Sequence, residues 1–142
     1  MRPALLLLLA ALGLGACAQG AARDNADDFQ GDERAVADAV FAFRDAVAKR
    51  DQDEVCEAYF TAQLRDDITE SGKAAGRGST CAQVVEDSIQ DIDATEVEIT
   101  DIRITGSGAE VDYKTDLTEG EDPVATLTLT DERGWRISEL PE

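Results

Sequence analysis

The chain has no histidine among its 142 residues. Histidine is the commonest general base, the usual partner of a catalytic nucleophile and a frequent ligand of transition metals. The many acidic residues could in principle bind calcium. However, the segment most similar to a calcium-binding loop, residues 51–54, lacks the glycine and the twelfth-position glutamate that such a loop needs. We therefore expect a protein that is not an enzyme and that binds no metal and no cofactor.

Positive charge is also scarce. The sequence has 13 Lys and Arg against 31 Asp and Glu, a formal net charge of −18. Such a surface repels the phosphates of nucleic acids and the headgroups of anionic lipids. We therefore expect no nucleic-acid partner, and attachment to a membrane would need an anchor other than charge.

Long apolar runs are missing as well. One short run, from Ala4 to Leu14, follows the basic Arg2, whereas a membrane-spanning helix needs about 18 or more apolar residues. A basic start, a short apolar core and small residues before a cut are typical of a secretory signal peptide. The run closes on Leu14-Gly15-Ala16-Cys17, which resembles the lipobox of bacterial lipoproteins.

The lipobox resemblance implies that the chain is cut after residue 16 and that Cys17 is acylated on its sulfur. The alternative is an ordinary signal peptide cut near Ala18, with Cys17 discarded. In the lipoprotein interpretation, residues 1–16 are the signal peptide, residues 17–31 are a polar, disordered tether and residues 32–142 are the folded domain. Two or more acyl chains would hold this domain on the outer face of the bacterial cell membrane.

The first part of the domain has helical spacing. Over residues 32–50, apolar side chains recur on one face at Val36, Val40, Phe43 and Val47. Shorter helices are predicted over 52–60 and 61–68. A glycine-rich loop without an apolar anchor is expected over 70–79. Thr80 and Gln83 form a capping-box pattern that opens another helix, ending near residue 92.

From residue 95 the apolar spacing changes to two, which indicates β-strands. The alternation changes phase between Ile99 and Ile102, so we expect a β-bulge near residues 100–101. Further strands are predicted over 109–117, 124–130 and 135–140, with turns at 106–108, 119–123 and 131–134. Helices followed by such a meander predict an α+β fold, with the helices packed on one face of a four-stranded antiparallel sheet.

The order of these elements resembles a known family. Residues 35–43, Ala-Val-Ala-Asp-Ala-Val-Phe-Ala-Phe, are followed by cysteines in the next two helical segments and by a meander closing on residues 134–137, Gly-Trp-Arg-Ile. Together these are similar to the small secreted or lipid-anchored members of the nuclear transport factor 2-like superfamily, which are common in actinobacteria. The resemblance covers about residues 32–140. It implies a curved sheet wrapped around helices into a cone with a pocket at its wide end.

Three cysteines remain to be assigned. If Cys17 carries lipid, Cys56 and Cys81 are left as a pair in a compartment where thiols oxidise. We therefore predict a Cys56–Cys81 disulfide that closes a loop of roughly 25 residues and stabilises the fold by about 3–4 kcal/mol. A redox-active pair is the alternative, but the chain has no Cys-x-x-Cys motif.

Aromatic residues, 5% of the chain, supply the candidates for a pocket. Phe43 belongs to the apolar stripe and is assigned to the core. Phe41 is harder to bury beside that stripe, so it is a candidate for the pocket lining together with Tyr59, Tyr113 and Trp135. For each of the four, ordinary core packing is the competing interpretation.

Two non-catalytic functions and one catalytic function are compatible with these features. The first is an adaptor that binds another envelope protein through its sheet, which predicts an exposed apolar patch on that face. The second is a binder of a small apolar ligand in the cone, which predicts a large apolar pocket. The third is a small-molecule isomerase or dehydratase, which predicts a carboxyl group with a strongly shifted pKa inside the cavity. The sequence favours the adaptor and leaves the oligomeric state open.

Overall fold

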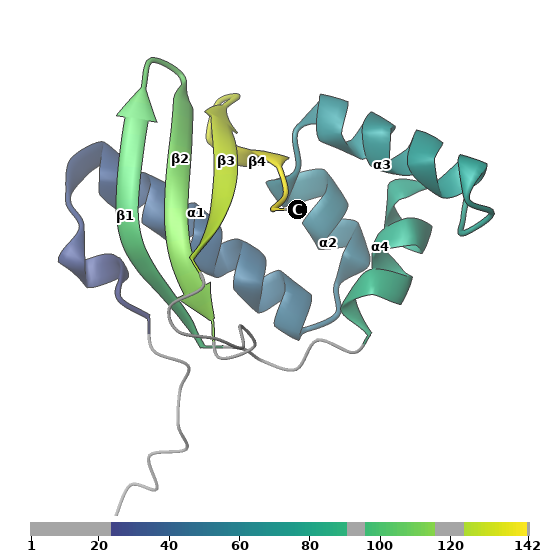
Figure 1. The fold of residues 1–142 in the computed structure, drawn as a ribbon, viewed down its shortest axis with the longest axis horizontal. Helices are drawn as coiled ribbons and strands as arrows, with labels where there is room; N and C mark the ends of the chain where they lie inside the picture. The colour runs from purple at the N-terminus through teal and green to yellow at the C-terminus, as the bar shows by residue number, and fades with distance from the viewer. Residues whose placement is uncertain (1–23, 91–95, 116–123, 142) are drawn as a thin grey trace, which may run out of the picture.

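The computed structural model of the protein describes residues 24–90, 96–115 and 124–141. Over these residues an antiparallel sheet of four strands is covered on one face by helices, so the predicted α+β class is confirmed (Figure 1). The predictions for the signal peptide, for Cys17, for residues 18–23 of the tether and for the turn at 119–123 fall outside the described residues.

The helices follow the predicted order. Helix α1 is Gly31–Ala48, and the short α2 (Gln52–Glu54) continues into one turn of π-helix, η2 (Val55–Tyr59). Helices α3 (Ala62–Ala74) and α4 (Cys81–Ile89) complete the set. The Thr80 hydroxyl accepts a hydrogen bond from the backbone N–H of Gln83 at 3.3 Å, which confirms the predicted N-cap of α4.

The predicted loop over residues 70–79 is wrong in its first half, because α3 continues to Ala74. Gly72 is buried, and a Cβ atom placed on it would lie 2.1 Å from Cγ2 of Val84 in α4. The glycine therefore allows α3 and α4 to approach closely, rather than marking a loop. The polypeptide turns only after it, and Gly76 has a left-handed φ of 68°.

The sheet is a meander in the order β1-β2-β3-β4. Its strands are β1 (Val97–Thr105), β2 (Gly108–Thr115), β3 (Ala125–Asp131) and β4 (Trp135–Glu139). The pairing of β1 with β2 shifts between Ile99 and Asp101, so the predicted bulge is confirmed. A second shift, between Thr128 and Leu129 where β3 pairs with β4, was not predicted.

The folded part of the chain begins before residue 32. A 3₁₀ helix, η1 (Ala26–Asp28), lies beside β1, and Ala26 is buried. The Asn25 side chain donates a hydrogen bond to the backbone oxygen of Ile99 at 2.9 Å and accepts one from its N–H at 3.1 Å. The assignment of residues 24–31 to a disordered tether is therefore wrong. The Asn25 amide makes the two backbone hydrogen bonds to Ile99 that a neighbouring strand would otherwise make.

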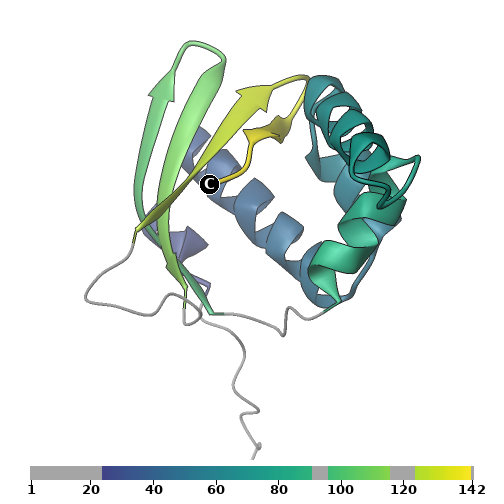
Figure 2. The same cartoon turned by 45° about the vertical axis from the view of Figure 1, so that its right-hand side comes forward.

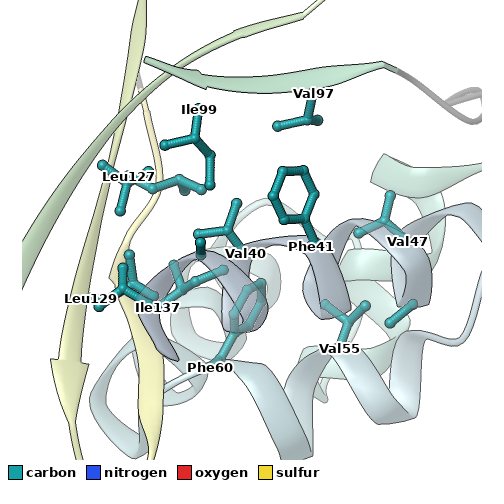
Figure 3. Close-up of a cluster of buried hydrophobic side chains, with 14 of the residues drawn as sticks. Val40, Phe41, Val47, Val55, Phe60, Val97, Ile99, Leu127, Leu129 and Ile137 are labelled. Atoms are coloured by element: carbon teal, nitrogen blue, oxygen red, sulfur yellow. The ribbon is translucent and has the colours of Figure 1, made fainter. Parts of the chain in front are cut away.

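The core lies between α1 and the inner face of the sheet (Figure 3). Phe41 is only 3% exposed and points from α1 toward Val97, whereas Phe43 is half-buried on another side of the helix. Of the two interpretations open for Phe41, core packing is therefore the one observed, and Phe43 packs against the core while also lining the cavity described below. The reason is that α1 contacts the sheet on one side and η2 on the other, so its apolar surface is wider than a single stripe.

Candidate functional site

A cavity of about 590 Å³ lies between the sheet and the helices. In Figure 2, the sheet stands on one side and α3 and α4 on the other, with α1 running between them. Most of the lining is apolar and comes from α1, η2, α3, α4, three strands and the C-terminal segment: Val40, Phe43, Val47, Val55, Phe60, Ile68, Val84, Val85, Ile89, Val97, Leu127 and Leu140. Two other hollows, of about 430 and 700 Å³, are lined mainly by polar and charged residues.

Helix α1 supplies one wall through Val40, Phe43 and Val47, which are spaced to share a helix face. The Phe43 ring is fixed by two aromatic neighbours from η2 and the residue after it. Its centroid lies 6.3 Å from that of Tyr59 in an edge-on contact, and 5.8 Å from that of Phe60. Such contacts hold the wall in place without filling the cavity.

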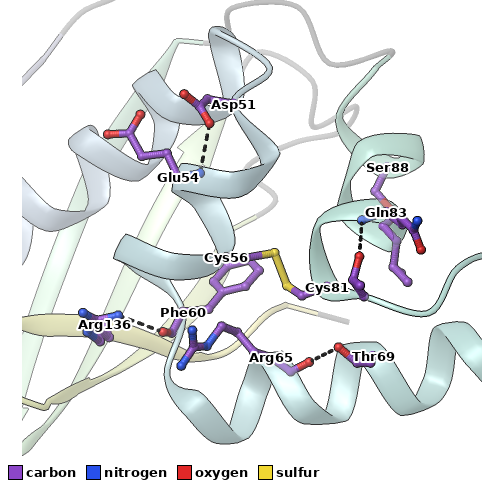
Figure 4. Close-up of a disulfide and its surroundings, with 12 residues drawn as sticks. Asp51, Glu54, Cys56, Phe60, Arg65, Thr69, Cys81, Gln83, Ser88 and Arg136 are labelled. Carbon is purple, nitrogen blue, oxygen red and sulfur yellow. Dashed lines mark hydrogen bonds between the residues drawn. A yellow bond between two sulfur atoms is a disulfide. The ribbon is translucent and has the colours of Figure 1, made fainter.

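The opposite wall depends on the predicted disulfide. Cys56 of η2 and Cys81 at the start of α4 are bonded, with their Cα atoms 6.2 Å apart (Figure 4). Val55 next to the first cysteine and Val84 and Val85 beyond the second all line the cavity. The disulfide therefore ties together two of the elements that enclose the cavity, and its prediction from cysteine parity is confirmed.

Three charged side chains border the cavity: Arg44, Asp67 and Arg77. Asp67 and Arg77 are exposed to solvent, whereas the Arg44 side chain is only 13% exposed. The Arg44 guanidinium lies 4.9 Å above the Phe41 ring, and its Nε and Nη2 both donate to Oδ1 of Asp45, at 3.0 and 2.7 Å. Its Nη1 is buried and has no hydrogen-bond partner.

Tyr113 on β2 adds a hydroxyl group to the lining. Burial raises the pKa of this phenol, so it stays protonated at neutral pH and can donate a hydrogen bond. No hydrogen bond joins its hydroxyl to any other residue within the described ranges. The walls of the cavity are thus mainly apolar, and Arg44 and Tyr113 are less exposed than the polar lining residues Asp67, Ser71, Arg77 and Ser88.

The outer face of the sheet has a different chemistry. Arg103 of β1 donates hydrogen bonds to Asp101, Glu110 and Asp112. Hydrogen bonds from Arg103 and then from Thr126 lower the pKa of the Asp112 carboxyl. The shifted carboxyl therefore lies in an exposed ion-pair network, away from the cavity.

The four predicted lining residues have different positions. Tyr113 lines the cavity. Phe41 is in the core, Trp135 packs partly buried against it, and Tyr59 supports Phe43 while its hydroxyl donates to Glu54 at 3.3 Å. Sequence reasoning missed Phe43 and Arg44 as lining residues, and the i, i+4 spacing of Arg44 from Val40 was the signal that could have identified the second.

Within the described residues, no group of three or more acidic or cysteine side chains is placed to hold a metal ion. The same residues contain no helix that is long and apolar enough to cross a membrane. No family model, curated protein or solved structure matches this chain. A functional assignment must therefore rest on the cavity itself.

Proposed function

We propose that the protein is a non-catalytic binder of a small apolar ligand, held in the cavity between the sheet and the helices. We further propose that the domain is a nuclear transport factor 2-like cone and that acyl chains on Cys17 anchor it to the outer face of the bacterial membrane. The observation that carries the ligand-binding proposal is a cavity of about 590 Å³ whose walls are mainly apolar.

The cavity has the properties of a small-molecule site. Pockets that bind drug-sized molecules have volumes of roughly 300–1,000 Å³, apolar walls and a few polar groups that orient the ligand. A water-filled cavity with walls of valine, isoleucine, leucine and phenylalanine leaves apolar surface in contact with water. Displacing that water with an apolar ligand is favourable by about 25 cal/mol for each Å² removed from solvent.

The adaptor function favoured by the sequence has less support. It required an exposed apolar patch on the sheet, but the outward side chains of β1 and β2 are mostly charged or polar, including Glu98, Arg103 and Glu110. Among the described residues, the exposed large apolar side chains are Val124 and Leu140, at 49% and 43%. Leu140 also lines the cavity, so its exposure is better explained by the ligand site.

An experiment with a neutral apolar fluorophore tests the proposal. The full chain carrying Cys17→Ser, which removes the acylation site and the need for detergent, is exported from a bacterial host and titrated with N-phenyl-1-naphthylamine. We expect saturable fluorescence enhancement. Val85→Phe, which projects into the cavity, should abolish it, and Glu86→Phe, on the exposed side of the same helix, should not.

Native mass spectrometry of the same preparation gives an independent readout. An adduct of a few hundred daltons that is lost on mild activation would identify a ligand acquired from the host. The proposal is wrong if the folded protein gives no saturable fluorophore binding, or if Val85→Phe and Glu86→Phe reduce it equally.

A further inference from the structure

Among the charged groups at the cavity, the guanidinium of Arg44 differs from the others in its burial, and a purely apolar ligand has no use for it. It is largely buried, while the two other charged residues at the cavity are exposed. Burying an arginine is costly unless its charge and its N–H groups are matched. Asp45 matches only part of it, because both contacts go to the same oxygen, Oδ1, and involve only Nε and Nη2.

The remaining donors of Arg44 are unmatched. Nη1 is buried and makes no hydrogen bond, although a guanidinium has five N–H donors arranged as a planar fork. With Nε and one side of Nη2 engaged by Asp45, the edge formed by Nη1 and Nη2 is left for another acceptor. This edge has the geometry to bind a carboxylate through two parallel hydrogen bonds.

The position of Arg44 indicates where that acceptor would lie. Its guanidinium stacks on Phe41, and Phe41 points toward Val97 on β1 (Figure 3). Val97 pairs with the last residue of β2, two positions after Tyr113. Arg44 of α1 and Tyr113 of β2 both line the cavity, and the part of its wall formed by α4 is mostly aliphatic, from Val84, Val85 and Ile89.

Resting on the proposed ligand-binding function, we infer that the ligand is an amphipathic monocarboxylic acid with an aliphatic body. Its carboxylate binds the free edge of Arg44 and accepts a hydrogen bond from the Tyr113 hydroxyl. Its aliphatic part lies against α1 and α4. A single negative charge fits better than a phosphate dianion, because Asp45 already lies on the other edge of the guanidinium and would repel a second charge.

The test compares two probes that differ only in the head group, dodecanoic acid and dodecan-1-ol. Each is titrated, below its micelle concentration, into the Cys17→Ser chain loaded with N-phenyl-1-naphthylamine, and its affinity is taken from displacement of the fluorophore. We expect the acid to bind more tightly than the alcohol at neutral pH. Arg44→Gln should weaken the acid by about tenfold or more and leave the alcohol unchanged, as expected for loss of a hydrogen bond to a charged group.

Two further variants keep the inference testable if Arg44→Gln folds poorly. Tyr113→Phe should weaken the acid selectively while keeping the ring, and Arg77→Gln at the exposed rim should have little effect on either probe. The inference is wrong if acid and alcohol bind equally to the parent chain, or if the Arg44 and Tyr113 variants reduce both to the same extent. Those results leave fluorophore binding intact, so they are distinct from failure of the proposed function.

Discussion

The effect of removing the Cys56–Cys81 disulfide on the free energy of unfolding follows directly from the length of the loop that it closes. The two cysteines are 25 residues apart in the sequence. In the chain-entropy model, closing a loop of that length lowers the entropy of the unfolded chain enough to stabilise the native state by about 3–4 kcal/mol at 25 °C. Domains of this size unfold with a free energy of roughly 5–15 kcal/mol, so the disulfide supplies a large part of the total.

The assay is urea unfolding of the Cys17→Ser chain with and without Cys56→Ala and Cys81→Ala. With a urea dependence of about 1–3 kcal/mol per molar, the double variant should unfold at a midpoint lower by about 1–4 M. Reduction of the parent chain should move its midpoint by a similar amount, because both treatments release the same loop. Single-cysteine variants are avoided, since a lone buried thiol can pair between molecules.

A double variant that unfolds within about 0.5 M of the parent would refute this prediction, since it would mean that the disulfide loop does not restrict the unfolded chain. A wide difference between the urea midpoints of the reduced parent and of the double variant would refute it as well. In that case the loss in the variant would come from packing around the alanines, since both cysteines are buried in the parent structure, at 3% and 8% exposure.

Three further perturbations test other parts of the structure. Gly72→Ala places a methyl group on Val84 and should lower the free energy of unfolding by about 1–3 kcal/mol in urea titrations, with part of the loss recovered by adding Val84→Ala. Asn25→Ala should destabilise the edge of β1 by about 1–2 kcal/mol and speed amide exchange there, whereas Asn25→Asp should retain the acceptor bond. Arg103→Gln should lower the free energy of unfolding near neutral pH. The difference from the parent should disappear as the pH falls through the lowered pKa of Asp112, because a carboxyl whose folded-state pKa is depressed stabilises the fold only while it is ionised.

The features predicted correctly from the sequence are those encoded by neighbouring residues. The change of phase between Ile99 and Ile102 located the bulge, because side chains on a strand alternate with a strict period of two. The Thr80 cap is predicted from a local pattern, because a threonine hydroxyl at an N-cap accepts a hydrogen bond from the N–H three residues on. Cysteine parity gave the disulfide, since only one pairing remained after Cys17 was set aside.

The features that were missed depend on contacts between distant residues. Gly72 was interpreted as a loop residue because its partner is on another helix. Asn25 was interpreted as part of a tether because its bonds reach 74 positions along the chain. The sequence does not decide how far Phe41 and Phe43 are each buried, because the position of η2 beside α1 determines which aromatic ring is covered. The sequence pattern does not identify Arg44 as a site residue, because arginine is usually exposed, whereas here its guanidinium stacks on the Phe41 ring.

The docking of Asn25 onto β1 also limits how far the domain can stand from a membrane. If Cys17 carries the proposed lipid, only residues 18–23 separate the anchor from the first described residue, Asp24. Even a fully extended backbone gains at most about 3.3–3.6 Å per residue, so this connection spans no more than roughly 25 Å. So short a connection would keep the domain close to the bilayer surface. The membrane would then be the nearest source of an amphipathic ligand.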